Sequence, residues 1–139
     1  MFKTILVPTD GSAPSRRAED AALMLARAGG ATLVMLAVAE SANAGPQRSV
    51  LPPGDDALLA AQERVQATAA RALAAGIACQ CSVAVSSAPW EEILKSAADL
   101  CCDAIVMAAY GVRGPQALAL GSQAQNVLAN ARLPVMIFR

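Results

Sequence analysis

Apolar and polar residues follow two patterns along the chain, one typical of strands and one typical of helices, and the order of these patterns predicts the order of the elements. Continuous apolar runs bounded by turn residues predict buried strands, and apolar residues three to four positions apart predict helices. The predicted strands are Lys3–Thr9, Ala31–Ala39, Ile77–Val85, Asp103–Ala108 and Leu133–Arg139. The predicted helices begin at Ser12, Asp55, Pro89 and Ser122.

The first predicted helix has clear start and stop signals. Ser12 is the expected N-cap, Pro14 lies in the first turn, and Gly29–Gly30 ends the helix. Residues at helical spacing are expected to face the core, and they are Ala18, Ala21, Ala22, Leu25 and Ala28. By contrast, residues 40–55 are rich in Gly, Pro and Ser and predict a long loop.

Strands that alternate with helices predict an α/β fold, a parallel sheet with helices on both faces. No break in composition divides the chain, so a single domain over residues 1–139 is expected. Ligands of open parallel sheets bind beyond the carboxyl ends of the strands, where the strand order reverses. If the first strand is central, the segments "PTDGS" and "AAYGVRG" meet at that point.

Composition narrows the range of functions. Eleven basic residues balance eleven acidic ones without a basic run, so no nucleic-acid partner is expected. The longest apolar run, Ala31–Ala39, is shorter than the roughly 20 residues that cross a bilayer, and the N-terminus does not resemble a signal peptide. A cytoplasmic protein without a membrane partner is therefore expected. Histidine is absent, which excludes Ser-His-Asp catalysis and histidine-bound zinc.

The four cysteines do not have the spacing of a zinc site. Cys79, Cys81, Cys101 and Cys102 are expected to be small buried hydrophobic residues. A thiol-based sensor is the alternative, and it requires Cys101 or Cys102 to be exposed with a lowered pKa.

Three glycines lie between the fourth strand and the last helix, at Gly111, Gly114 and Gly121. Glycine allows backbone N–H groups to approach an anion, and the helix that begins at Gly121–Ser122 directs its positive end to the same place. Arg113 adds a positive charge to the segment. Tight turns are the alternative explanation, and Ser122 with Gln125 fits an S-x-x-Q capping box that needs no ligand.

Two segments resemble the universal stress protein family: "ILVPTDGSAPSRRAEDAALMLA" near the start and "MAAYGVRGPQALALGSQAQNVLANARLPVMIF" near the end. The resemblance extends over the whole chain. It implies a Rossmann-like, adenine nucleotide-binding fold with one five-stranded parallel sheet in the order 3-2-1-4-5. It also implies a regulatory homodimer in the stress response rather than an enzyme. One branch of the family binds ATP through G-x2-G-x9-G-[ST], and another lacks the pattern and binds no nucleotide.

The resemblance assigns residues to an ATP site. Gly111, Gly121 and Ser122 match the second half of the pattern, whereas Ala108 replaces its first glycine and would weaken binding. Pro8, Thr9 and Asp10 match the adenosine side, and the backbone of Val38 matches a position that meets adenine. The remaining expected contacts flank the motif glycines or lie between them, and they are Met107, Arg113, Gly114 and Gln123. The expected ligand is ATP, with or without Mg²⁺, and at most slow hydrolysis is expected.

In the order 3-2-1-4-5 the last strand is an edge strand, and an apolar edge favours pairing with a second copy of the chain. A homodimer through Leu133, Val135 and Ile137 is expected, together with a regulatory protein partner of unknown identity. Two further functions stay open at this point, a nucleotide-free dimeric interaction protein and an adenylating enzyme on a related fold.

Overall fold

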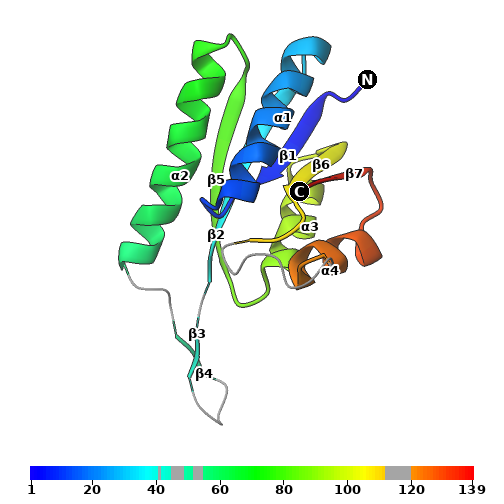
Figure 1. The fold of residues 1–139 in the computed structure, drawn as a ribbon. Helices are drawn as coiled ribbons and strands as arrows, with labels where there is room; N and C mark the ends of the chain where they lie inside the picture. Colours follow the sequence, from blue (N-terminus) through cyan, green and yellow to red (C-terminus); the bar gives the residue numbers. More distant parts are fainter. Residues whose placement is uncertain (41, 45–48, 52–54, 112–119) are drawn as a thin grey trace.

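A five-stranded parallel sheet forms the centre of the protein, in a computed structural model that describes residues 1–40, 42–44, 49–51, 55–111 and 120–139. Its strands lie in the order β5-β2-β1-β6-β7, and each neighbouring pair is parallel (Figure 1). Their bounds are β1 (Thr4–Pro8), β2 (Thr32–Glu40), β5 (Cys79–Ser86), β6 (Ala104–Ala108) and β7 (Val135–Phe138). These are the five predicted strands, and their order confirms the expected 3-2-1-4-5 sheet.

Helices cover both faces of the sheet, as the alternation of strands and helices predicted (Figure 1). They are α1 (Ala13–Gly29), α2 (Asp55–Ala74), α3 (Pro89–Asp99) and α4 (Ser122–Asn130). Successive residues of a strand point to opposite faces. Ile5 and Val7 therefore pack with α1 and α2, whereas Leu6 packs with α3 and α4.

The first helix has the predicted ends. Ser12 is the N-cap and its hydroxyl accepts a hydrogen bond from the backbone N–H of Ser15, while Gly30 ends the helix in the left-handed region. The predicted inward face needs a correction, since Ala26 is buried and Ala28 is exposed. Each residue advances a helix by about 100°, so Ala26 stays in line with Ala22 while Ala28 turns to solvent.

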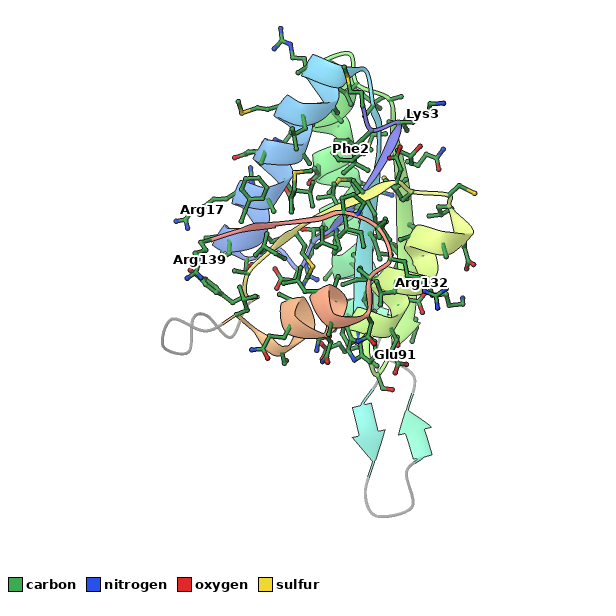
Figure 2. The ribbon with its side chains drawn as sticks, turned by 90° about the vertical axis from the view of Figure 1, so that its right-hand side faces the viewer. Phe2, Lys3, Arg17, Glu91, Arg132 and Arg139 are labelled. Carbon is green, nitrogen blue, oxygen red and sulfur yellow. The ribbon has the colours of Figure 1, made fainter. Side chains whose placement is uncertain are left out.

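The segment expected to be a long loop contains a short antiparallel pair. β3 (Ala42–Ala44) pairs with β4 (Ser49–Leu51), so the expectation for residues 40–55 was wrong in this part. In Figure 2 the pair projects beyond the end of the sheet marked by Glu91, opposite the end marked by Lys3. In the described part of the chain, every helix is too short or too polar to span a membrane.

Candidate functional site

The carboxyl ends of β1 and β6 meet at Asp10 and Gly111. The two strands are direct neighbours, so the residues that follow them lie at one edge of the sheet. Gly111 is so near Asp10 that a Cβ at position 111 would overlap Oδ2 of the carboxylate. The structure thus brings together Asp10 and Gly111, which belong to the two segments that the sequence predicted would meet, and residues 112–114 of the second segment lie outside the described residues.

Asp10 begins a tight turn between β1 and α1. Its Oδ1 accepts a hydrogen bond of 2.9 Å from the backbone N–H of Ser12, which is a common turn geometry for aspartate. Gly11 follows with a φ of 81°, a conformation that favours glycine. The side chain of Arg64, from α2, packs on this turn, and a Cβ at Gly11 would lie 3.0 Å from its Nε.

Thr9 is buried behind the turn, at 7% exposure. Its backbone N–H donates to the carbonyl of Leu36, and its hydroxyl donates to the carboxylate of Glu19. Both donors of Thr9 are used within the fold, so its side chain supports the turn from behind. Pro8 is the last residue of β1 and pairs with Leu36 of β2.

Val38 lies on the part of β2 that runs past the end of β1. The pairing of β2 with β1 ends at Leu36, whereas its pairing with β5 continues through Val38 and Ala84 to Glu40. Val38 is half-buried against the α3 and α4 side of the sheet. It is therefore at the carboxyl end of the sheet, where the sequence placed it.

Met107 and Ala108 end β6 on opposite faces of the sheet. Met107 is buried among residues of the α3 and α4 side, and Ala108 packs partly against the core under α1 and α2. Among the described residues other than glycine, Cys101 alone has a positive φ. Alanine at position 108 consequently carries no left-handed backbone strain, and its methyl group matters only if a ligand approaches it.

The start of α4 is held against the end of β6. Gly121 is the N-cap, and its N–H donates to the carbonyl of Ala109 at 2.7 Å. A Cβ at position 121 would lie 3.2 Å from that oxygen and 3.2 Å from the Cα of Tyr110, which is tighter than ordinary van der Waals contact, so the close approach favours glycine. Ser122 is the first residue of the helix and is exposed.

The predicted capping box at Ser122 and Gln125 is wrong. Among the described residues no side chain caps the start of α4, because Gly121 rather than Ser122 is the N-cap. The side chain of Gln125 donates instead to the carbonyl of Leu120 at 2.6 Å. The neighbouring Gln123 uses its Oε1 to accept from the N–H of Trp90, which ties α4 to the start of α3. Arg113 and Gly114 lie outside the described residues.

The cysteines are not the buried hydrophobic residues that were expected. Cys81 and Cys101 are exposed, Cys79 and Cys102 are half-buried, and all four are free thiols. Partial burial, with a smaller contribution from the nearby Asp103 and Cys101, raises the pKa of Cys102 to about 11. A sensor thiol needs a lowered pKa, so Cys102 does not meet that condition.

Sequence reasoning missed Glu19, which is 4% exposed beneath the turn. Its carboxylate accepts hydrogen bonds from the hydroxyls of Thr9 and Thr68. A signal was available, because Glu19 lies four residues after Ser15 and three before Ala22 on the buried stripe of α1.

A parallel sheet with a strand-order reversal beside a glycine-containing turn defines the class of Rossmann-like α/β proteins that bind ligands at this edge. The chain belongs to the universal stress protein family, whose model matches residues 1–139. It is 36% identical over 140 residues to the universal stress protein in the QAH/OAS sulfhydrylase 3′ region of Thermus aquaticus, with 100% of each chain covered.

Solved structures of the family share this fold. A universal stress protein in complex with cAMP is 25% identical, covers 99% of this chain and 97% of its own, and has a TM-score of 0.72. The universal stress protein from Archaeoglobus fulgidus in complex with dAMP is 20% identical, covers 100% of this chain and 98% of its own, and has a TM-score of 0.73.

Proposed function

We propose that this protein is a cytosolic regulatory protein of the stress response that binds an adenine nucleotide, with ATP as the first candidate. The observation that carries the proposal is the contact between Asp10 and Gly111. It brings the turn after β1 and the glycine segment after β6 together where open parallel sheets bind their ligands. Four free cysteines fit a reducing compartment.

The start of α4 supplies the phosphate side of the proposed site. Its N-cap is Gly121, without a side-chain hydrogen bond, and the N–H groups of a first helical turn favour an anion. The exposed Ser122 adds a hydroxyl at the same place. The solved family members with cAMP and dAMP support adenine nucleotides as the ligand class.

The proposed role is binding rather than turnover. Asp10 lies at this edge and one of its oxygens already accepts a hydrogen bond from Ser12, while the described residues contain no group of three or more Asp, Glu, Cys or His side chains that could hold a metal ion. In this proposal Mg²⁺ arrives on the phosphates of ATP, since one carboxylate makes a poor magnesium site by itself. Hydrolysis is slow at most, and the bound nucleotide acts as the signal.

The open edge of β7 supports a homodimer as part of the proposal. The carbonyls of Pro134 and Phe138 accept hydrogen bonds from Ile105 and Ala109 on the β6 side. Backbone groups alternate sides along a strand, so the peptide groups of Val135 and Ile137 face away from β6. Together with the half-buried Leu133 they offer an edge to a second copy, and the dimer surface would receive a regulatory protein partner.

A nucleotide-free interaction protein is the second candidate. Ala108 favours it, because the first motif glycine is missing. The close contact of Gly111 with Asp10 does not separate the two candidates, since such an approach calls for glycine with or without a ligand.

The two candidates are separated by nucleotide content and affinity. The protein is purified, denatured and its supernatant run on ion exchange; the apo protein is then titrated with ATP, AMP and cAMP by calorimetry. Co-purified nucleotide or micromolar affinity supports the binding function. If the wild-type protein neither carries nor binds nucleotide but the Ala108→Gly variant binds it, the nucleotide-free branch is supported. If the variant does not bind nucleotide either, the proposal of a phosphate site is wrong.

Sedimentation at micromolar concentration tests the dimer. The wild-type chain should sediment as a dimer, and Ile137→Pro, which removes an outward N–H, should shift it toward the monomer. A monomeric wild-type profile would contradict the dimer and leave the nucleotide proposal untouched.

A further inference from the structure

Glu19 is a buried carboxylate that lies directly behind the proposed nucleotide site. It is 4% exposed and belongs to the stripe of α1 that packs on the sheet and on α2. Burial of a carboxylate is costly unless hydrogen bonds and opposite charge compensate it. Here the hydroxyls of Thr9 and Thr68 both donate to it, and Nη1 of Arg71 lies 3.5 Å from Oε2.

A chain of hydrogen bonds runs from Glu19 to the backbone of the turn. The hydroxyl of Thr9 donates a hydrogen bond to the carboxylate of Glu19, and the hydroxyl of Ser15 donates a hydrogen bond of 2.9 Å to the oxygen of Thr9. The backbone N–H of Asp10 then donates to the Oγ of Ser15 at 3.2 Å. The carboxylate is thereby connected to the residue that contacts Gly111.

The carboxylate of Glu19 fixes which group donates and which accepts in each of these hydrogen bonds. A carboxylate only accepts hydrogen bonds, so Thr9 must donate toward it. The oxygen of Thr9 then accepts from Ser15, and the oxygen of Ser15 accepts from the amide of Asp10. An amide side chain in place of Glu19 has both a donor and an acceptor, so the direction would no longer be fixed.

One face of helix α2 contacts the turn at one residue and α1 at two more. Arg64 packs on Gly11, Thr68 donates to Glu19, and Arg71 pairs with Glu19 and Asp20. Residues four and three apart share a helix face. The conformation of the turn is therefore tied to α2 through Glu19.

We infer that Glu19 is a positioning residue for nucleotide binding, which holds the turn at Asp10–Ser12 in its binding conformation and couples it to α2. The inference rests on the proposed function. It assigns Thr9 and Ser15 to the support of the turn rather than to side-chain contact with the ligand.

The test compares Glu19→Gln with Glu63→Gln, an exposed glutamate on α2 that serves as the matched control. ATP affinity is measured by calorimetry, and the exchange of the Asp10 amide is measured by NMR in the ligand-free protein. Glu19→Gln should weaken ATP binding by about tenfold, the scale on which outer partners of a binding site act. It should also speed exchange at Asp10, while Glu63→Gln changes neither.

Position 68 supplies a second pair in case Glu19→Gln fails to fold. Thr68→Val removes the hydroxyl that donates to Glu19 and keeps the shape, and Thr68→Ser restores the hydroxyl. The valine variant should weaken ATP binding and speed exchange at Asp10, and the serine variant should recover both. A purely structural role would lower the melting temperature without this pattern.

The outcomes separate the inference from the proposed function. Unchanged ATP affinity in Glu19→Gln and Thr68→Val, with a wild type that binds, overturns the inference and leaves the function standing. A wild type that binds no nucleotide overturns the function. The inference is then wrong as well, whatever the exchange rate of the Asp10 amide in Glu19→Gln. An unchanged rate would show that Glu19 does not hold the turn. A faster rate would show that Glu19 holds the turn but has no role in ligand binding.

Discussion

Gly111 lies directly against the carboxylate of Asp10, with no room for a side-chain carbon between them. The two residues are far apart in sequence and end neighbouring strands, so one contact joins the first and fourth βα units of the sheet. Oδ1 of the same carboxylate accepts from the N–H of Ser12, which fixes its orientation. Position 111 is consequently a sensitive probe of the site.

Replacement of Gly111 by alanine should disturb both stability and binding. The new Cβ would overlap Oδ2 of Asp10, so the carboxylate must rotate away from position 111 or the turn must move with it. We expect a loss of about 1–3 kcal/mol in the free energy of unfolding, as for other overpacked sites, together with a loss of ATP binding. Urea denaturation and calorimetry measure the two effects.

Gly76→Ala is the matched control for this change. Gly76 has a φ of 76°, and a Cβ at this position would have nothing within 4 Å, so the cost there is backbone strain of about 1 kcal/mol without any steric overlap. Its ATP affinity should stay at the wild-type value. Equal affinities for Gly111→Ala and the wild type would show that the approach of Asp10 has no role in binding.

Ala108→Gly should change affinity and stability in opposite directions. The backbone at Ala108 does not have a positive φ, so the glycine relieves no strain, and a residue without a side chain weakens a strand by about 0.5–1 kcal/mol. If a phosphate approaches the methyl group, ATP affinity should rise about tenfold, or ~1.4 kcal/mol. Paired thermal melts and titrations check this, and a stability loss without tighter binding would contradict it.

Ser122→Ala separates helix capping from ligand binding. Because Ser122 is exposed and is not the N-cap, its removal should change stability by no more than about 0.5 kcal/mol. A hydrogen bond to a charged phosphate is worth more, so we expect ATP affinity to fall about tenfold.

Ser12→Ala calibrates the stability part of that experiment. Ser12 is the N-cap of α1, so its loss should cost about 1 kcal/mol in a denaturant titration. If Ser122→Ala destabilises the protein as much as Ser12→Ala does, Ser122 acts in the helix rather than on a ligand.

The sheet could be predicted from sequence because every strand is an apolar run between turn residues. Thr32–Glu40 is buried on both faces, and no helical period fits that pattern. The hairpin of β3 and β4 could not be predicted in this way, since its strands of three residues are too short to show a period. Helical spacing predicted that Ala28 would be buried, and this was wrong because alanine is small enough to occupy either a buried or an exposed position.

The candidate site was predictable in its backbone and not in its side-chain partners. Glycine at positions 111 and 121 indicates that another part of the chain lies very close to the backbone there, and the structure has such a neighbour at both positions. The role of Glu19 depends on Thr9, which follows β1, and on Thr68 and Arg71, which both come from α2. No pattern within one helix reveals that these groups converge. The start of α4 was misjudged for a related reason, because the choice of N-cap depends on the contact between Gly121 and Ala109.

The thiol of Cys102 should react slowly with alkylating reagents at neutral pH. Its pKa is raised from 9.0 to about 11, chiefly by burial and then by the charges of Asp103 and Cys101. At pH 8 the thiolate fraction falls by tenfold for each unit of pKa, so it should be about 100-fold below that of an unperturbed cysteine. The alkylation rate of Cys102 should therefore stay low at pH 8 and rise steadily up to about pH 11.

Mass spectrometry of iodoacetamide-treated protein over a range of pH measures this rate. A cysteine-containing peptide in the same tube gives the unperturbed rate, and Asp103→Asn should speed the reaction because it removes a negative charge near the thiol. The thiolate is the reactive form, so the raised pKa argues against a sensor role for this residue. Alkylation of Cys102 at the peptide's rate at pH 8 would reverse that conclusion and restore the thiol sensor as a function to be tested.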